Sequence, residues 1–169
     1  MVETSTRTHG LRLQSFGAVV LICLQSGVGM FVNLFVAIPD NHAGSKPSDF
    51  FSGSTQSIGW AVAHGAVALV IHTELGLLLA VMVIGIVARA LSIGRRALTT
   101  WVVLGALFTI GAGFNGASFL DYNKDVSSFV MTALALAALL CFMVVVYVPW
   151  ETKASTPTEE PRLNVPGAN

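Results

Sequence analysis

The sequence predicts an all-α membrane protein built as a bundle of four transmembrane helices. Only 11% of its 169 residues are charged and 54% are hydrophobic, whereas a soluble domain carries roughly 25% charged residues. Most charged residues fall at the two ends and in the connections. The runs between them exceed the ~18 apolar residues that indicate a transmembrane helix. This pattern is typical of an integral, multi-pass membrane protein.

Four apolar runs are long enough to cross a bilayer. The first ends at Pro39 and the fourth at Pro149, and proline cannot continue a helix. The second is roughly ten residues longer than the ~20 that cross the hydrocarbon core, so we expect it to tilt or to project beyond the membrane. The expected spans, within a transmembrane domain over residues 15–149, are residues 16–38, 58–91, 98–119 and 126–148.

Basic residues predict the orientation of the chain. Seven lie in or near the N-terminal segment 1–14, the second connection or the tail 150–169: Arg7, Arg12, Arg89, Arg95, Arg96, Lys153 and Arg162. The other two connections hold two, Lys46 and Lys124. Because Lys and Arg are in excess on the cytoplasmic side, we expect both termini in the cytoplasm and the protein in the plasma (inner) membrane. The loop 39–57 is then external. The polar, Pro- and Thr-rich tail is expected to be disordered.

Several functional classes are disfavoured by composition. The formal net charge is zero, so nothing indicates a nucleic acid or another polyanionic partner. Cys23 and Cys141 lie within apolar runs and form no CxxC pair, which argues against a disulfide framework or a zinc site. No hydrolytic triad, Walker loop or dinucleotide fingerprint is present. The sequence therefore gives only a weak case for an enzyme.

Small residues recur every four positions in the last two spans. Such rows let helix backbones approach closely in a membrane. They favour a tight bundle and, equally, docking onto a partner subunit. The rows are Gly105, Thr109, Gly113 and Ala117 in the third span, and Ala133, Ala137 and Cys141 in the fourth.

The second span contains three ionisable residues, in the segment HGAVALVIHTELGLLL (64–79). If residues 58–91 form one helix, His72 and Glu74 lie near its middle and His64 lies roughly 12–18 Å further out. His72 and Glu74 then face about 160° apart, so each needs a partner from another helix or from water. Polar groups at this depth cost free energy unless they are paired, and they are functional hypotheses by default.

Polar residues of other spans are candidate partners. Gln25 lies at a depth where it can meet His72 or Glu74, and Asn33 and Asn115 lie in the outer parts of their spans. We therefore predict a polar pocket in the outer half of the bundle, roofed by the loop 39–57. Its expected members are Gln25, Asn33, His64, His72, Glu74 and Asn115.

Haem ligation is one use of such a pocket, because imidazole is a common axial ligand of membrane cytochromes. His64 and His72 stand about 12 Å apart on the expected helix and cannot bind one iron from both faces. A haem b site with a single histidine, or with Met30 or Met131 as second ligand, stays open.

Three other interpretations use the same residues. Glu74, His72 and Gln25 with water are candidates for a proton or small-solute conduit. His42, with Asp40 and Asp49 or with His64, is a candidate metal site, although the spacing matches no established motif. The simplest interpretation is that the polar groups form hydrogen bonds between helices and set the register of the bundle.

Two segments carry a resemblance. LQSGVGMFVNLFV (24–36) followed by HTELGLLLAVMVIGIVARAL (72–91) resembles small four-helix membrane proteins common in actinobacteria, and more distantly one four-helix half of haem A synthase. The resemblance covers mainly residues 21–91 and implies that His72 is the position of a haem-ligand histidine. Those halves supply a second histidine from the fourth helix, whereas residues 126–148 contain none.

The leading functional prediction is a non-enzymatic accessory or interaction subunit of a larger membrane assembly, in contact with lipid and with other membrane subunits or further copies of itself. The alternatives are a haem-binding electron-transfer module that uses His72 and His64, and a conduit around Glu74. The small-residue rows favour the first, the histidines the second and the intramembrane acid the third.

Overall fold

The computed structural model describes residues 2–149, with side chains from residue 8. The described chain folds into five helices: α1 (Val2–Phe35), α2 (Phe50–His64), α3 (Val67–Ile93), α4 (Arg96–Tyr122) and α5 (Asp125–Tyr147). Four contain segments that are long and apolar enough to cross a membrane, namely Thr8–Phe35, Val67–Ile93, Arg96–Tyr122 and Asp125–Tyr147. The predicted all-α class with four membrane-spanning helices is confirmed at this level.

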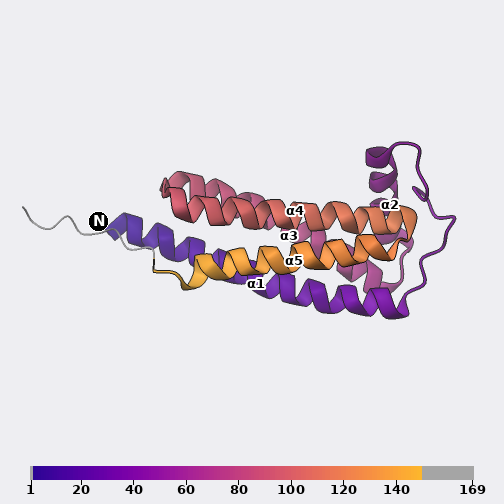
Figure 1. Ribbon diagram of the computed structural model, residues 1–169, viewed down its shortest axis with the longest axis horizontal. Coiled ribbons are helices and arrows are strands. Elements are labelled where there is room, and N and C mark those ends of the chain that lie inside the picture. The colour runs from indigo at the N-terminus through magenta and orange to yellow at the C-terminus, as the bar shows by residue number, and fades with distance from the viewer. Residues whose placement is uncertain (1, 150–169) are drawn as a thin grey trace, which may run out of the picture.

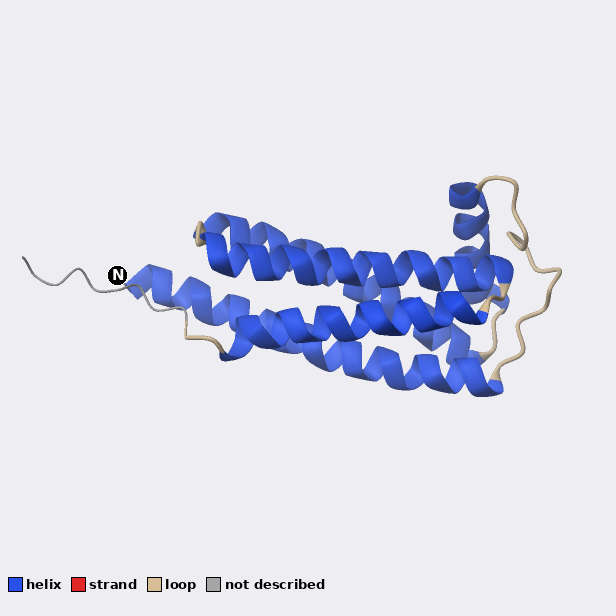
Figure 2. Cartoon of the chain, viewed as in Figure 1, coloured by secondary structure: helices blue, strands red, loops and turns tan. Residues whose placement is uncertain are grey.

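The four long helices lie side by side, and α2 lies at one end of them (Figure 1). Helix α1 packs between α3 and α5, and α4 also contacts α3 and α5, so α1 and α4 are diagonal to each other. Helix α2 packs on α3 and α4. The long loop 36–49 lies at the same end as α2 (Figure 2), and we call this the α2 end. The beginning of α1 lies at the opposite end, where Arg12 donates a hydrogen bond to the carbonyl of Val148.

Local capping signals explain where the helices end. Gly94 and Asn123 close α3 and α4 in the left-handed conformation, with φ of 72° and 50°, which glycine and asparagine adopt most readily. The turns that follow are short, so α3, α4 and α5 run antiparallel. Helix α2 begins after Asp49, whose carboxylate accepts a hydrogen bond from the backbone N–H of Ser52 at 2.8 Å, a standard N-cap.

The bundle has two apolar clusters. The larger joins all four long helices and surrounds the fully buried Phe142 and Val83. The smaller lies beneath α2 and consists of Val32, Ala61, Leu69 and Leu120. The cap formed by loop 36–49 and α2 therefore rests on its own small core, apart from the main one.

The expected continuous span 58–91 is wrong, because the chain breaks at Gly65. The backbone is extended at Gly65 and Ala66, with ψ of 160° and 148°. A Cβ atom at position 65 would lie 2.4 Å from the carbonyl oxygen of Ala61, so glycine permits this sharp break. Helix α2 thus lies at the end of the bundle, and of the two helices only α3 runs along its length. The expected loop 39–57 is also corrected, since its second half belongs to α2.

The break changes the depth of the ionisable residues. Helix α3 is centred on residue 80, so His72 and Glu74 lie about 12 and 9 Å from its middle, toward the α2 end. Their expected position near the midplane depended on a helix that continued back to residue 58. His64 belongs to α2 and has no fixed angular relation to His72 along one helix.

The other helix ends differ less from the expected spans, except at the start of α1. Helix α1 is continuous from Val2, well before residue 16, and it ends at Phe35, before Pro39. Helices α4 and α5 start and stop within three residues of the expected ends. The tail 150–169, expected to be disordered, lies outside the described residues.

Candidate functional site

Gln25 and His72 meet at the interface of α1 and α3. The Gln25 side-chain amide donates a hydrogen bond to the backbone carbonyl of His72 at 3.0 Å. The same Nε2 atom lies 3.4 Å from Nε2 of the His72 ring, where the ring nitrogen acts as acceptor. These contacts tie the two helices together at a depth where water is scarce.

Two glycines make room for this pair. A Cβ atom on Gly29 of α1 would lie 2.7 Å from Cε1 of His72, and one on Gly76 of α3 would lie 3.1 Å from Nε2 of Gln25. Each polar residue thus stands four positions before a glycine on its own helix, and each glycine accommodates the polar side chain of the other helix. The role of Gly76 was missed from sequence, although the matched spacings Gln25-x₃-Gly29 and His72-x₃-Gly76 are its signal.

The His72 ring is enclosed in this interface. Its Nδ1 atom and the Oε1 atom of Gln25 are buried and have no hydrogen-bond partner among the described residues. Nε2 faces the Gln25 amide. Neither ring nitrogen is therefore open to an iron atom in this packing, and the residues as arranged do not fit a haem at His72.

The other four predicted pocket residues lie apart from this pair. Asn33 is exposed and accepts a hydrogen bond from Ser128 of α5 at 3.3 Å. Asn115 donates to the Gly111 carbonyl of its own helix at 2.9 Å. His64 is exposed at the end of α2, and Glu74 is exposed on α3. Of the six residues, the structure brings only Gln25 and His72 into hydrogen-bond contact.

A second polar cluster lies at the α2 end, around His42. This residue is 8% exposed, and its ring stacks on Trp60 with centroids 4.4 Å apart. Nδ1 lies 2.9 Å from the Ala43 carbonyl oxygen and Nε2 lies 3.0 Å from that of Leu120. Both ring nitrogens are thus bonded to main-chain oxygens of the protein.

Asp121 is the second member of this cluster, and it was not among the predicted site residues. It is 2% exposed, and its Oδ2 atom accepts a hydrogen bond from the Ser54 hydroxyl of α2 at 2.8 Å. The backbone N–H of Lys46 donates to its carbonyl at 2.8 Å. Position 121 near the end of α4 gives no sequence signal for burial, because α2 covers it only in the folded chain.

The expected metal ligands do not converge. His42 is occupied by two carbonyl oxygens, and Asp40 and Asp49 are exposed. Among residues whose side chains the structure describes, no three His, Cys, Asp or Glu side chains come close enough to bind one metal ion.

Helix α3 is the least buried of the four candidate membrane spans. In its most apolar 18-residue stretch 17% of residues are buried, against 22–28% in the other spans. Among the exposed residues of α3, six are spaced alternately by four and three positions: Val67, Ile71, Glu74, Leu78, Val81 and Gly85. We call these six residues the α3 stripe. This spacing is the one by which helices pack at shallow left-handed crossings, and the stripe carries a carboxyl group at Glu74.

No family model, curated protein or solved structure matches the chain. The resemblance to small actinobacterial four-helix proteins and to haem A synthase halves therefore stays a prediction.

Proposed function

We propose that this small integral membrane protein is a non-enzymatic accessory or interaction subunit of a larger membrane assembly, and that the α3 stripe contacts the partner. The observation that carries the proposal is Glu74, which is exposed and is the one polar side chain of the α3 stripe. In an isolated chain this carboxyl group faces lipid.

The chemistry of Glu74 specifies the partner. An ionised side chain costs about 2.5–3.5 kcal/mol at the centre of a membrane helix and less toward its ends. A Lys or Arg on a neighbouring helix at the same depth offsets this cost by pairing with the carboxylate. A second copy of this chain would instead place one Glu74 opposite another, and like charges repel. The partner we propose is a transmembrane helix of a different subunit that carries a basic residue.

The positions of the other polar residues give less support to the alternatives. A haem at His72 requires a free ring nitrogen, and both are enclosed against α1. A conduit requires Glu74 to join His72 and Gln25 in a relay, whereas Glu74 faces away from that interface as an exposed residue. Interaction through the α3 stripe uses Glu74 where the fold places it.

Site-specific photo-crosslinking in native membranes tests the proposal. A photoreactive residue at Leu78, in the α3 stripe, is expected to give an adduct with one other membrane protein. The matched control is Leu140, which is exposed on α5 at 66% against 53% for Leu78. Glu74→Leu should abolish the Leu78 adduct, because it removes the charge that the partner neutralises, and restoring a carboxyl group with Glu74→Asp should recover part of it.

The identity of the adduct decides the outcome. Mass spectrometry should find a protein with a basic residue inside a transmembrane helix. Exchanging the two charges, with Glu74→Lys in this chain and an acidic residue in place of the partner's basic residue, should restore the Leu78 adduct. An adduct with a second copy of this chain, equal adducts at Leu78 and Leu140, or an adduct unaffected by Glu74→Leu would contradict the proposal.

A further inference from the structure

The two hydrogen bonds of His42 specify its protonation state. Its two ring nitrogens face the carbonyl oxygens of Ala43 and Leu120 at 2.9 and 3.0 Å. A carbonyl oxygen only accepts hydrogen bonds, and a neutral imidazole carries one N–H. Both bonds form together only if both nitrogens carry a proton. We infer that His42 is an imidazolium that latches the cap, loop 36–49 and α2, onto α4, and that the cap opens when His42 loses a proton.

The surroundings of His42 suit a cation. Asp121 is 2% exposed and follows directly after Leu120, the acceptor of one His42 bond. One of its carboxylate oxygens is bonded to Ser54, and the other, Oδ1, is buried without a partner among the described residues. The Asp121 carboxyl group and the His42 ring line the same small cavity, and opposite charges held close together in a buried site offset part of the cost of burying each other. The face of Trp60 stacks on the His42 ring at 4.4 Å, which also favours a cation.

The other ionisable groups around His42 come from two elements. Asp40 and Lys46 of the loop, and Asp121 and Tyr122 of α4, line with it a cavity of about 10 Å³. Two carboxyl groups and one ammonium group thus line the same small cavity as the ring.

Helix α2 contributes no charge near the ring. Its ionisable residue is His64, at the exposed end of the helix, and Trp60 is the α2 residue that meets His42. The charged groups near His42 therefore come from the loop and from α4.

Loss of a proton weakens the cap and spares the bundle. A neutral His42 keeps one bond, and its other nitrogen then presents a lone pair to a carbonyl oxygen in a buried site. That leaves a buried acceptor unsatisfied. The cap rests on the small cluster of Val32, Ala61, Leu69 and Leu120, which is separate from the main core. The latch is independent of the partner-binding role proposed for Glu74, which lies on α3.

Two measurements on the full chain in detergent micelles test the latch. Nitrogen NMR of histidine-labelled protein at about pH 5.5 should show both His42 ring nitrogens protonated, because histidines change charge between roughly pH 5 and 8. The rate of backbone amide hydrogen exchange over residues 36–64, corrected for the intrinsic effect of pH, should then be at least about tenfold higher at pH 8 than at pH 5.5. Exchange in α3, α4 and α5 should stay constant.

Two variants separate His42 from other titrating groups. His42→Gln is neutral at all pH values, so exchange of the cap should be fast and independent of pH. His64→Gln removes the exposed histidine of α2 and should leave the pH dependence unchanged. The inference is overturned if NMR finds a single neutral tautomer of His42 while the cap is closed, or if the pH dependence persists in His42→Gln. The NMR result needs no variant, so it holds even if His42→Gln fails to fold.

Discussion

At the scale of single residues, Gln25 and His72 show how polar side chains are accommodated between apolar helices. Gly29 on α1 leaves space for the His72 ring, and Gly76 on α3 leaves space for the Gln25 amide. The space allows the 3.0 Å hydrogen bond from Gln25 to the His72 carbonyl. Interhelical hydrogen bonds in membranes contribute about 0.6 kcal/mol on average, so this pair acts mainly by fixing the register of α1 against α3.

Gly29→Ala should destabilise the bundle by about 1–2 kcal/mol, as overpacked sites do. The new Cβ would lie 2.7 Å from Cε1 of His72, and the Gln25 contacts hold that ring in place. Thermal unfolding in detergent micelles measures the effect. Gly27→Ala is the matched control on the same helix, because nothing lies within 4 Å of a Cβ there, and alanine is the better helix former. Equal melting temperatures for the two variants would contradict this account.

At the scale of helices, the small residues of α4 are used within the bundle. A Cβ on Gly105 would lie 3.0 Å from Phe142 and 3.2 Å from Cβ of Cys141, both on α5. Gly111 and Gly116 similarly face Leu134 and Met131, at 3.3 and 3.2 Å. The row Gly105, Thr109, Gly113 and Ala117 was expected to serve either the bundle or a partner. Gly105 serves the α4–α5 contact, whereas Gly113 is exposed and nothing lies within 4 Å of a Cβ there. Close packing of backbones replaces the hydrophobic drive that lipid does not supply.

Gly105→Leu should therefore separate α4 from α5 and lower stability by about 2–3 kcal/mol, within the range of overpacking. Gly85→Leu adds the same side chain to α3, where nothing lies within 4 Å of the Cβ, and it should leave the unfolding of the isolated chain nearly unchanged. Denaturation followed by circular dichroism in mixed micelles compares the two. A larger loss for Gly85→Leu than for Gly105→Leu would show that the α4–α5 contact is not the tighter one.

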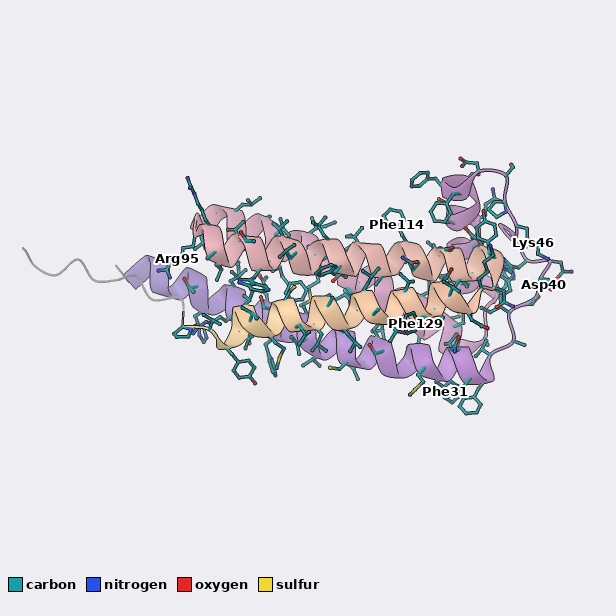
Figure 3. The ribbon with its side chains drawn as sticks, in the orientation of Figure 1. Phe31, Asp40, Lys46, Arg95, Phe114 and Phe129 are labelled. Atoms are coloured by element: carbon teal, nitrogen blue, oxygen red, sulfur yellow. The ribbon has the colours of Figure 1, made fainter. Side chains whose placement is uncertain are left out.

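At the scale of the whole molecule, the arginines whose side chains are described gather at the end of the bundle opposite α2. Asp40 and Lys46 lie at the α2 end, and Arg95 lies at the other end, by the α3–α4 turn (Figure 3). By the excess of basic residues on the cytoplasmic side, we propose that the α2 end is external. The His42 latch would then respond to the pH outside the cell.

Cysteine labelling tests this orientation. In a variant with Cys23 and Cys141 replaced by alanine, Ser48→Cys in the loop should react with a membrane-impermeant maleimide on intact cells. Ser92→Cys, at the end of α3 beside the α3–α4 turn, should react only after the membrane is opened. Ser48 and Ser92 are both exposed, so a difference in labelling reports the side of the membrane. The reverse labelling pattern would contradict the proposed orientation.

The sequence by itself determined the class of the protein and its helices. Long apolar runs and stop signals such as Pro39 and Pro149 act locally, so the ends of α4 and α5 could be predicted within three residues. The contact between Gln25 and His72 was foreseeable from their similar depths.

Only the tertiary structure decided how α2 and the polar groups are arranged. Gly65 breaks the second apolar run because α2 can then cover Asp121 and the small cluster beneath it. That advantage comes from contacts between segments far apart in the chain, which a local pattern does not contain. The same break moved His72 and Glu74 toward the α2 end and left Glu74 on the outward face of α3. The depth of a side chain in the bundle depends on where its helix starts. The direction in which it faces depends on what packs against that helix, and only the folded chain sets these two properties.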